Sequence, residues 1–295
     1  MVNLLSKSQK AVLYMVGSVI CFSTMDLIVK YLNNVPFGQV LFMRFFFGMI
    51  PILFLIPRDK FLTFYKTKRP ILHTFRAVSG TIAIIALFVG LRNLPLADVI
   101  SLTFTGPLFV TVMSVIFLSE KVGIRRWTAV VVGFIGMLFI VRPAFETMNF
   151  YYIFPVIFSL GFANVAISIR SLSKTEPNYL IAFYFSLLSL LVGLSTIING
   201  WIWPTPYEAF LFVLLGLAGG VANLLLTQSY RLADASLVSP IKYLSLVVAV
   251  VAGYFIFSEI PKSMTLFGAS LIVISSFIIF KREETLKKQV VAPRV

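Results

Sequence analysis

Residues 115–122 read VIFLSEKV and residues 254–261 read YFIFSEIP, and these two stretches decide the fold. In each, a long apolar run stops at a serine followed by a glutamate, at Ser119-Glu120 and at Ser258-Glu259. The two glutamates are 139 positions apart in a chain of 295 residues. A spacing of nearly half the chain indicates an internal repeat.

The composition shows that the chain is too apolar to fold in water. It is 59% hydrophobic and 12% charged, whereas a soluble domain is about 45–50% apolar and about 25% charged. We therefore expect the lipid bilayer to surround most of the chain. The net charge of +14 comes from basic residues in short segments between apolar runs. Such residues set membrane orientation, so we expect no nucleic acid partner.

Ten apolar runs are long enough, or nearly so, to cross a membrane as helices. A spanning helix needs about 20 mainly apolar residues, whereas a barrel strand needs about 10 that alternate in polarity. We therefore predict an all-α integral membrane protein with ten transmembrane helices. The predicted spans are 10–32, 37–56, 71–91, 96–118, 127–141, 150–169, 180–198, 209–229, 235–257 and 264–280.

Lysine and arginine predict the orientation of these spans. Most of them fall in the connections on the side of the N-terminus, including the segment 58–70. The connections on the other side hold Arg92, Arg142 and Lys262. Because cytoplasmic loops carry the excess of basic residues, we predict that the N- and C-termini are both cytoplasmic.

A shift of 139 residues keeps the chain in register with itself. Phe104 then falls on Tyr243, and near the start of each half a shift of 141 places Pro36 on Pro177. Each half has five spans, an odd number, so the second half is inverted relative to the first. Inverted repeats are typical of secondary transporters. We predict a first five-helix repeat over 1–145, a second over 146–282 and a cytoplasmic tail over 283–295.

The layout resembles the drug/metabolite transporter superfamily, and specifically its EamA-type domain. The segment 97–143 is similar to the family's first-half pattern, and the segment 233–261 is similar to the second-half pattern, except that Leu246 stands where a proline is common. The matching first-half residues are Ala97, Pro107, Glu120, Gly133 and Gly136.

Within that family, the first half resembles the subgroup that includes S-adenosylmethionine uptake transporters. Arg44, the stretch HTFRA (73–77) and the stretch RRW (125–127) carry this resemblance. The subgroup also resembles carriers of riboflavin, amino acids and carboxylates, so the resemblance leaves the substrate open.

Asp26 and Arg44 are charged residues inside the first two predicted spans. Each needs a reason, because a charge near the bilayer centre costs about 2.5–3.5 kcal/mol on insertion scales. One interpretation is that Asp26 holds a proton or a substrate amine, while the planar fork of Arg44 binds a carboxylate. The alternative is a structural ion pair between Asp26 and Lys30, one turn apart, with Lys30 reaching outward.

Arg76 and Lys242 are the other basic residues inside spans that we assign to the substrate path. For Arg76, and for His73 one turn before it, the alternative is a side chain that reaches the cytoplasmic headgroups. Lys242 follows Pro240, which frees backbone carbonyls that a cavity or a neighbour must satisfy. Asn164 and Asn223 either contact substrate or bridge helices. The predicted substrate-binding residues are Asp26, Arg44, Arg76, Asn164, Asn223, Lys242 and Tyr243.

Lys30, Glu120 and Glu259 are predicted to have gating or structural roles. The two glutamates lie at membrane boundaries, at helix C-termini whose dipole disfavours an acid. Each should therefore bind a basic residue or the exposed N–H groups of a neighbouring helix.

The sequence favours transport over catalysis. It lacks a phosphate-binding G-x-x-x-x-G-K-[ST] loop, and a single histidine and the single cysteine Cys21 predict no metal site, no cofactor and no enzyme. Four basic residues in the spans against one clearly buried acid, Asp26, predict an anionic group on the substrate.

We therefore expect a multi-pass secondary active transporter of the cell inner membrane, a monomer or homodimer. It would move a small polar, carboxylate-bearing metabolite, S-adenosylmethionine or amino-acid-like, by alternating access, driven by protons or a counter-transported solute. The alternatives are a carrier of organic acids, riboflavin or other metabolites, and a flippase for a lipid-linked substrate. An intramembrane enzyme and a non-transporting scaffold rank below these.

Overall fold

The structure, a computed structural model, describes residues 7–60, 63–118, 123–147, 149–172, 175–232 and 239–291. Within these ranges the chain forms α-helices and short 3-10 helices and contains no β-strand. The α-helices are α1 (Lys7–Tyr31), α2 (Phe37–Phe54), α3 (Pro70–Asn93), α4 (Leu96–Thr103), α5 (Gly106–Leu118), α6 (Ile124–Thr147), α7 (Ile153–Leu172), α8 (Asn178–Ser195), α9 (Pro206–Leu232), α11 (Leu244–Phe257) and α12 (Ser263–Val291). The 3-10 helices are η1 (Leu32–Asn34), η2 (Arg58–Lys60), η3 (Phe150–Tyr152), η4 (Thr196–Asn199) and η5 (Ser239–Tyr243).

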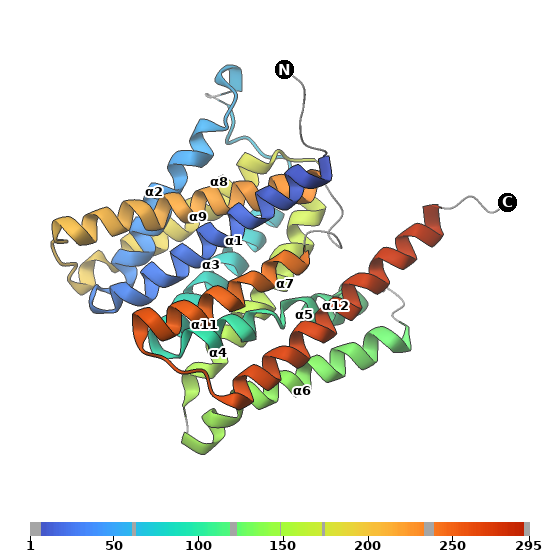
Figure 1. The fold of residues 1–295 in the computed structure, drawn as a ribbon. Coiled ribbons are helices and arrows are strands. Elements are labelled where there is room, and N and C mark those ends of the chain that lie inside the picture. Colours follow the sequence, from blue (N-terminus) through green and yellow to red (C-terminus); the bar gives the residue numbers. More distant parts are fainter. Residues whose placement is uncertain are drawn as a thin grey trace.

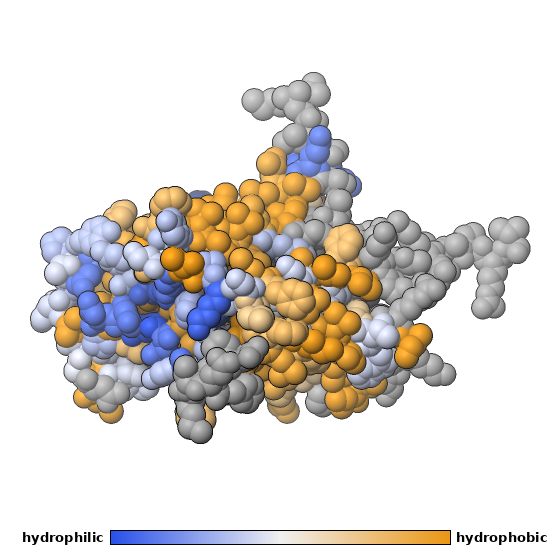
Figure 2. Space-filling view, turned by 60° about the horizontal axis from the view of Figure 1, so that its bottom comes forward, coloured by the Kyte–Doolittle hydropathy of each residue, from blue (hydrophilic) through white to orange (hydrophobic). Residues whose placement is uncertain are grey.

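The described chain is a multi-pass membrane protein by the length and hydropathy of its helices. Seven helical segments are long and apolar enough to cross a bilayer, and three shorter apolar helices lie at Trp127–Val141, Ile241–Phe257 and Ser263–Ile278. Large apolar side chains are exposed along them, including Phe54, Ile71 and Phe255. Figure 2 shows apolar side chains over the middle of the molecule and hydrophilic ones gathered at one end. Such a large exposed apolar surface is compatible with lipid and not with water.

Helix pairs that are far apart in sequence build the bundle (Figure 1). The first helix α1 packs on α9, and α7 packs on α3. The helices α2 and α8 pack on each other, while α2 also contacts α9 and α8 also contacts α3. At one side, α6 packs along α12. Every one of these contacts either joins equivalent helices of the two halves or has a counterpart when the halves are exchanged.

The predicted span 96–118 is not one continuous helix. It divides into α4 and α5 around Phe104 and Thr105. Pro107 has no N–H to donate to the carbonyl four residues earlier, which is that of Thr103. The Ser159 hydroxyl donates to the Thr103 carbonyl at 3.3 Å and to the Leu102 carbonyl at 3.0 Å. The carbonyl that Pro107 leaves free is thus satisfied by α7, as burial in a membrane requires.

The predicted span 235–257 has an irregularity at the equivalent place. Its described part begins as η5, which includes Pro240, and becomes regular only in α11 from Leu244 onward. Residues 233–238 lie outside the described ranges. Tyr243 ends η5, and its ring packs edge-on against the ring of Phe104 at a centroid distance of 5.0 Å. The two residues that the 139-residue shift aligns therefore meet where both segments change conformation.

Ser258 explains the abrupt end of the YFIF run. Its φ of 54° and ψ of 32° are in the left-handed region, so that the helix α11 stops there. The Glu259 N–H then donates to the Gly253 carbonyl at 2.9 Å, which closes the helix end. Left-handed backbone disfavours a residue with a side chain, so this turn costs conformational free energy. The contacts that the turn allows Glu259 to make must offset that cost.

The contact between α6 and α12 yields a stability prediction. A Cβ at Gly268 would lie 2.4 Å from the Gly136 carbonyl oxygen. A Cβ at Gly136 would lie 2.7 Å from the Gly268 carbonyl oxygen. Because both obstacles are backbone atoms, we expect Gly268→Ala to destabilise the protein by about 1–3 kcal/mol. Thermal unfolding in detergent should show a lower midpoint. Gly123→Ala, where a Cβ meets nothing within 4 Å, should leave the midpoint unchanged, and equal midpoints for both variants would contradict the prediction.

Candidate functional site

Two buried arginines are connected through a pair of phenylalanine rings in the middle of the bundle. The Arg44 guanidinium of α2 lies 4.8 Å from the centroid of the Phe45 ring. The Phe45 ring packs edge-on against Phe185 of α8 at 5.2 Å, and the Arg76 guanidinium of α3 lies over Phe185 at 4.2 Å. We call these four residues the arginine–phenylalanine cluster. It brings together two of the predicted substrate-binding residues.

Glycines make the space in which Arg44 lies. A Cβ at Gly219 of α9 would be 2.3 Å from the guanidinium carbon, and a Cβ at Gly48 would be 2.6 Å from Nη1. On the other side, Arg44 Nε donates to the Met25 sulfur at 3.2 Å. The side chain is only 3% exposed. The small residues of α9 thus let α2 approach closely and leave a slot that the guanidinium fills.

Asp26 lies beside Arg44 and is not paired with Lys30. The carboxylate is 8% exposed and its Oδ1 has no hydrogen-bond partner. Arg44 is its electrostatic neighbour, although the two side chains are beyond ion-pair distance. The alternative of a structural Asp26–Lys30 pair is wrong, because Lys30 turns toward a different carboxylate described below.

Arg76 and His73 are buried between α3 and α8. They are 7% and 1% exposed, which rules out the alternative that they reach lipid headgroups. Arg76 Nε and Nη1 and both ring nitrogens of His73 lack hydrogen-bond partners. The His73 ring lies 4.8 Å from that of Tyr184, the neighbour of Phe185 on α8. Two groups that can carry positive charge therefore lie one turn apart in a closed interior.

Lys242 and Tyr243 lie in a second group, at the irregular segments of the chain. The Lys242 ammonium lies 5.7 Å from the centroid of the Phe162 ring of α7. Phe162 also borders Gly106 at the start of α5, and Tyr243 contacts Phe104.

Asn164 and Asn223 bind the backbone of their own helices. The Asn164 amide donates to the Leu160 carbonyl at 3.5 Å, and the Asn223 amide donates to the Gly219 carbonyl at 3.1 Å. Both side chains are partly buried. Neither amide bridges two helices through these bonds, and a role in substrate binding stays a prediction.

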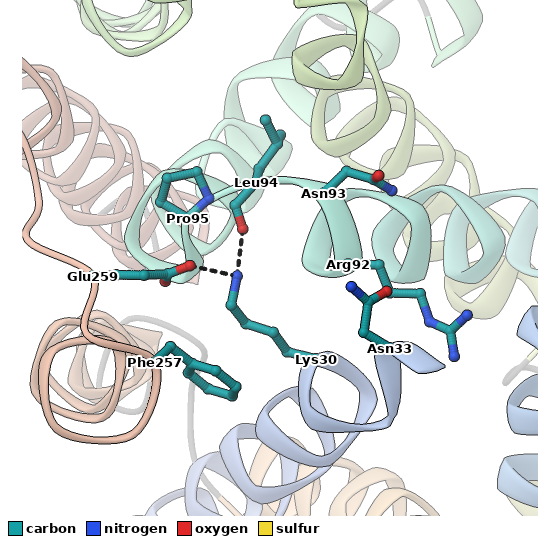
Figure 3. Close-up of a pocket in the computed structure, with 8 residues that line it drawn as sticks. All are labelled: Lys30, Asn33, Arg92, Asn93, Leu94, Pro95, Phe257 and Glu259. Carbon is teal, nitrogen blue, oxygen red and sulfur yellow. Dashed lines mark hydrogen bonds and ion pairs between the residues drawn. The ribbon is translucent and has the colours of Figure 1, made fainter. Parts of the chain in front are cut away.

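A polar pocket of about 360 Å³ lies where α1, α3 and α11 end. The Lys30 ammonium pairs with Glu259 Oε1 at 2.7 Å and donates to the Leu94 carbonyl at 2.6 Å. Figure 3 shows Lys30 pointing toward both groups, while Arg92 points away from them. Arg92 instead donates to the Leu32 and Val35 carbonyls at 2.7 and 2.9 Å. We call this the terminal pocket; its lining residues are Lys30, Asn33, Arg92, Asn93, Leu94, Pro95, Phe257 and Glu259.

Glu259 has both kinds of partner that its position predicts. Besides the Lys30 ammonium, its Oε2 accepts a hydrogen bond from the Leu96 N–H at 2.8 Å. That N–H is at the start of α4, where a helix favours negative charge. The equivalent Glu120 lies outside the described residues, so its contacts stay a prediction.

Asp98 is a buried acid that the sequence analysis missed. It is 3% exposed, in the first turn of α4. It accepts hydrogen bonds from the Tyr152 hydroxyl and, at 2.7 Å, from the Thr265 hydroxyl. The count of one buried acid is therefore wrong. Its position three residues after Pro95, the N-cap of α4, could have indicated an acid in the first turn of a helix. Nothing in the sequence predicts its hydrogen-bond partners.

Comparison with known proteins agrees with this architecture. Residues 9–142 and 149–281 each match the EamA-like transporter family. One solved crystal structure has a TM-score of 0.63 and 15% sequence identity, and the match covers 96% of this chain and 99% of that one.

Several curated relatives are similar over most of their length. An S-adenosylmethionine uptake transporter of Rickettsia bellii is 30% identical, over 92% of this chain and 94% of its own. A riboflavin transporter of Rhizobium johnstonii is 30% identical, over 94% and 93%. The pseudopaline exporter CntI of Pseudomonas aeruginosa is 27% identical, over 86% and 90%. All three are named for transport, so the expectation that the chain is not an enzyme is confirmed, and the chain belongs to the EamA-like transporter family.

Proposed function

We propose that this transporter carries a small polar metabolite that bears a carboxylate, and that Arg44 and Arg76 bind it. The observation that carries the proposal is the pair of buried guanidinium groups. Among the described residues, no carboxylate lies within ion-pair distance of either one. A buried, unpaired charge is costly, and a carboxylate that docks on a guanidinium fork offsets this cost with two charge-assisted hydrogen bonds.

The names of the relatives define the compounds to test first. S-adenosylmethionine and amino acids carry a carboxylate, and the relatives from Rickettsia bellii and Pseudomonas aeruginosa are named for an S-adenosylmethionine and a pseudopaline substrate. Organic acids have the same group. Riboflavin, after which the Rhizobium johnstonii relative is named, is the useful contrast because it lacks a carboxylate.

We further propose alternating access by two inverted five-helix repeats, in an inner membrane and with both termini cytoplasmic. The counterpart contacts of α1 with α9 and of α7 with α3 support this arrangement. So does the register of the close contacts. By the predicted shifts, Gly80 falls on Gly219 and Arg44 falls on Phe185. In the structure Gly80 packs against Phe185, and Gly219 packs against Arg44.

In this arrangement the terminal pocket is at the outer face, and Lys30 and Glu259 close it. Lys30 belongs to the first half and Glu259 to the second, so their ion pair and the bond from Leu96 N–H to Glu259 both join the halves. Asp98 adds two further bonds between α4 and the second half. Outward opening must break or exchange these contacts.

The role of Arg44 is tested by substitutions that separate charge from geometry. We expect Arg44→Gln to lower uptake of the transported carboxylate by about 10–100-fold, since a charge-assisted hydrogen bond contributes about 1.5–3 kcal/mol. Arg44→Lys should recover only part of the lost uptake, because the ammonium keeps the charge but lacks the planar fork. The measurement is uptake of labelled S-adenosylmethionine, amino acids and organic acids into proteoliposomes. Arg58→Gln, an exposed cation, is the control, and wild-type uptake by Arg44→Gln would contradict the proposal.

The slot at Gly219 gives a test that leaves every charge in place. We expect Gly219→Ala to displace the Arg44 guanidinium and to reduce uptake at least about 10-fold, the effect of roughly 1.4 kcal/mol. The matched control is Gly17→Ala in α1, where a Cβ would meet only the end of the flexible Leu225 side chain at 3.2 Å. Equal uptake by the two variants would mean that the position of the guanidinium does not matter.

Closure of the terminal pocket is tested by the reactivity of a buried cysteine. In a Cys21→Ala background, Ser101→Cys places a thiol in α4 at a fully buried position. We expect Glu259→Gln to raise its rate of labelling by a membrane-impermeant maleimide about 10-fold, because losing roughly 1.4 kcal/mol of closure shifts the equilibrium tenfold. Arg58→Gln, an exposed cation in the connection between α2 and α3, should label like the background. An unchanged rate in Glu259→Gln would show that the ion pair does not hold the pocket closed.

A further inference from the structure

We propose that His73 carries a proton together with the substrate anion, so that this protein couples carboxylate transport to a proton. The inference rests on the proposed function for the identity of the anion. It assigns to His73 a coupling role, with Arg76 as the group through which substrate and proton affect each other.

His73 is placed for such a role by its burial and by its open bonding capacity. Its side chain is 1% exposed, and neither ring nitrogen has a hydrogen-bond partner. A buried polar group without a partner costs free energy, so a purely structural histidine at this position is unfavourable. Histidine is also the side chain whose ordinary change of charge falls between about pH 5 and 8, and this chain has one histidine.

Three groups in the described part of the chain surround the imidazole. Arg76 lies one turn along α3 and Glu176 lies in the connection between α7 and α8; both act on His73 electrostatically. From α8, Tyr184 contacts the ring, but its hydroxyl is directed elsewhere because it donates to the Tyr65 carbonyl. His73 therefore lies between a cation on the side of the arginine–phenylalanine cluster and an anion on the other side.

The carboxylate of Glu176 marks the side toward which the proton would leave. Glu176 accepts hydrogen bonds from the Thr67 hydroxyl at 2.9 Å and from the Lys68 N–H at 3.0 Å. It is thus held at the end of the bundle where α3 begins, which the proposed topology makes the cytoplasmic end. The order Arg44, Arg76, His73, Glu176 runs from the buried cluster toward that end.

The coupling follows from the charge of Arg76. With the site empty, the carboxylate of Glu176 favours a proton on His73, while repulsion from the buried Arg76 cation disfavours it. A carboxylate bound to Arg76 neutralises this cation and so favours protonation of His73. By linkage, a proton on His73 must favour carboxylate binding by the same factor. Anion and proton then load together and leave together.

The single histidine allows this to be measured directly in the full-length protein. We would label the protein with ¹⁵N-histidine, purify it with a histidine-free tag, and follow the one imidazole signal as a function of pH. Arg76→Gln should move the titration midpoint upward by about one pH unit, the usual effect of removing one neighbouring charge. Arg44→Gln, which removes a cation that does not border His73, should leave the midpoint near that of the wild type. In the wild type, adding succinate, glutamate or S-adenosylmethionine should raise the midpoint for whichever compound binds.

An imidazole that does not titrate between pH 5 and 9 would overturn the proposal. So would equal midpoints in Arg76→Gln and the wild type. If Arg76→Gln does not fold, the compounds added to the wild type test the same charge, and a bound carboxylate that leaves the midpoint in place would reject the coupling.

Transport completes the test. With the same compounds, wild-type proteoliposomes that contain a pH-sensitive dye should acidify inside as substrate enters. His73→Gln should retain exchange of labelled for unlabelled substrate but lose this acidification. Thr74→Gln, an exposed neighbour, should behave like the wild type, and full acidification by His73→Gln would overturn the proposal. If the wild type moves none of the compounds, the proposed function fails, while the titration still decides whether Arg76 governs the proton on His73.

Discussion

The requirement that buried polar groups find partners inside the protein shapes this structure more than any other constraint. In hydrocarbon no water satisfies a free carbonyl or a charge. The break between α4 and α5 is satisfied by Ser159 of α7, whose hydroxyl donates to the Thr103 carbonyl that Pro107 leaves free and to the Leu102 carbonyl. The ends of α1 and η1 are held by Arg92, and Glu259 meets both a lysine and a helix N-terminus. In each of these cases the partners come from segments distant in sequence, so these polar bonds fix the packing.

The same requirement makes the unmet cases informative. Asp26, His73 and Arg76 keep buried polar atoms without partners, and Arg44 has only a thioether as the acceptor for its Nε. These charged or titratable groups lie on α1, α2 and α3. Elsewhere the unpartnered buried atoms are the Arg92 Nε and the hydroxyls of Ser23, Ser101, Tyr243 and Ser275, and of these residues only Arg92 is charged and its Nη2 is bonded. A buried ion without a counter-ion costs free energy, so it suggests a site where a ligand supplies the missing partner. This contrast, more than the presence of charge, separates the candidate site from the scaffold.

The sequence predicted most of the helices and singled out charged residues that the structure buries, but it did not predict their partners. Run length and hydropathy are local properties, so the spans could be derived with nearly the observed limits. The pairing of Lys30 with Glu259 instead of Asp26 could not, because it depends on how α1 meets α11 across more than 200 residues. The division of span 96–118 at Phe104 was within reach, since Pro107 signals a missing hydrogen bond. Asp98 lies in the first turn of α4, where an acid is common at a helix start, and its burial depends on the tertiary contacts with Tyr152 and Thr265.

The register between the halves shows how a repeat can yield an asymmetric site. Gly80 and Gly219 occupy equivalent positions, and each packs against a side chain of the neighbouring second-span helix, Phe185 or Arg44. The small residue is kept in both halves, while its partner is a ring in one and a guanidinium in the other. Arg76 then stacks on that ring, so a second cation lies beside the slot that holds Phe185. The two halves thus provide two similar slots. A ring fills one and a guanidinium fills the other, so the same packing holds a fixed charge on one side. The repeat relates the helices around the candidate site, whereas both guanidinium groups of the arginine–phenylalanine cluster come from the first half.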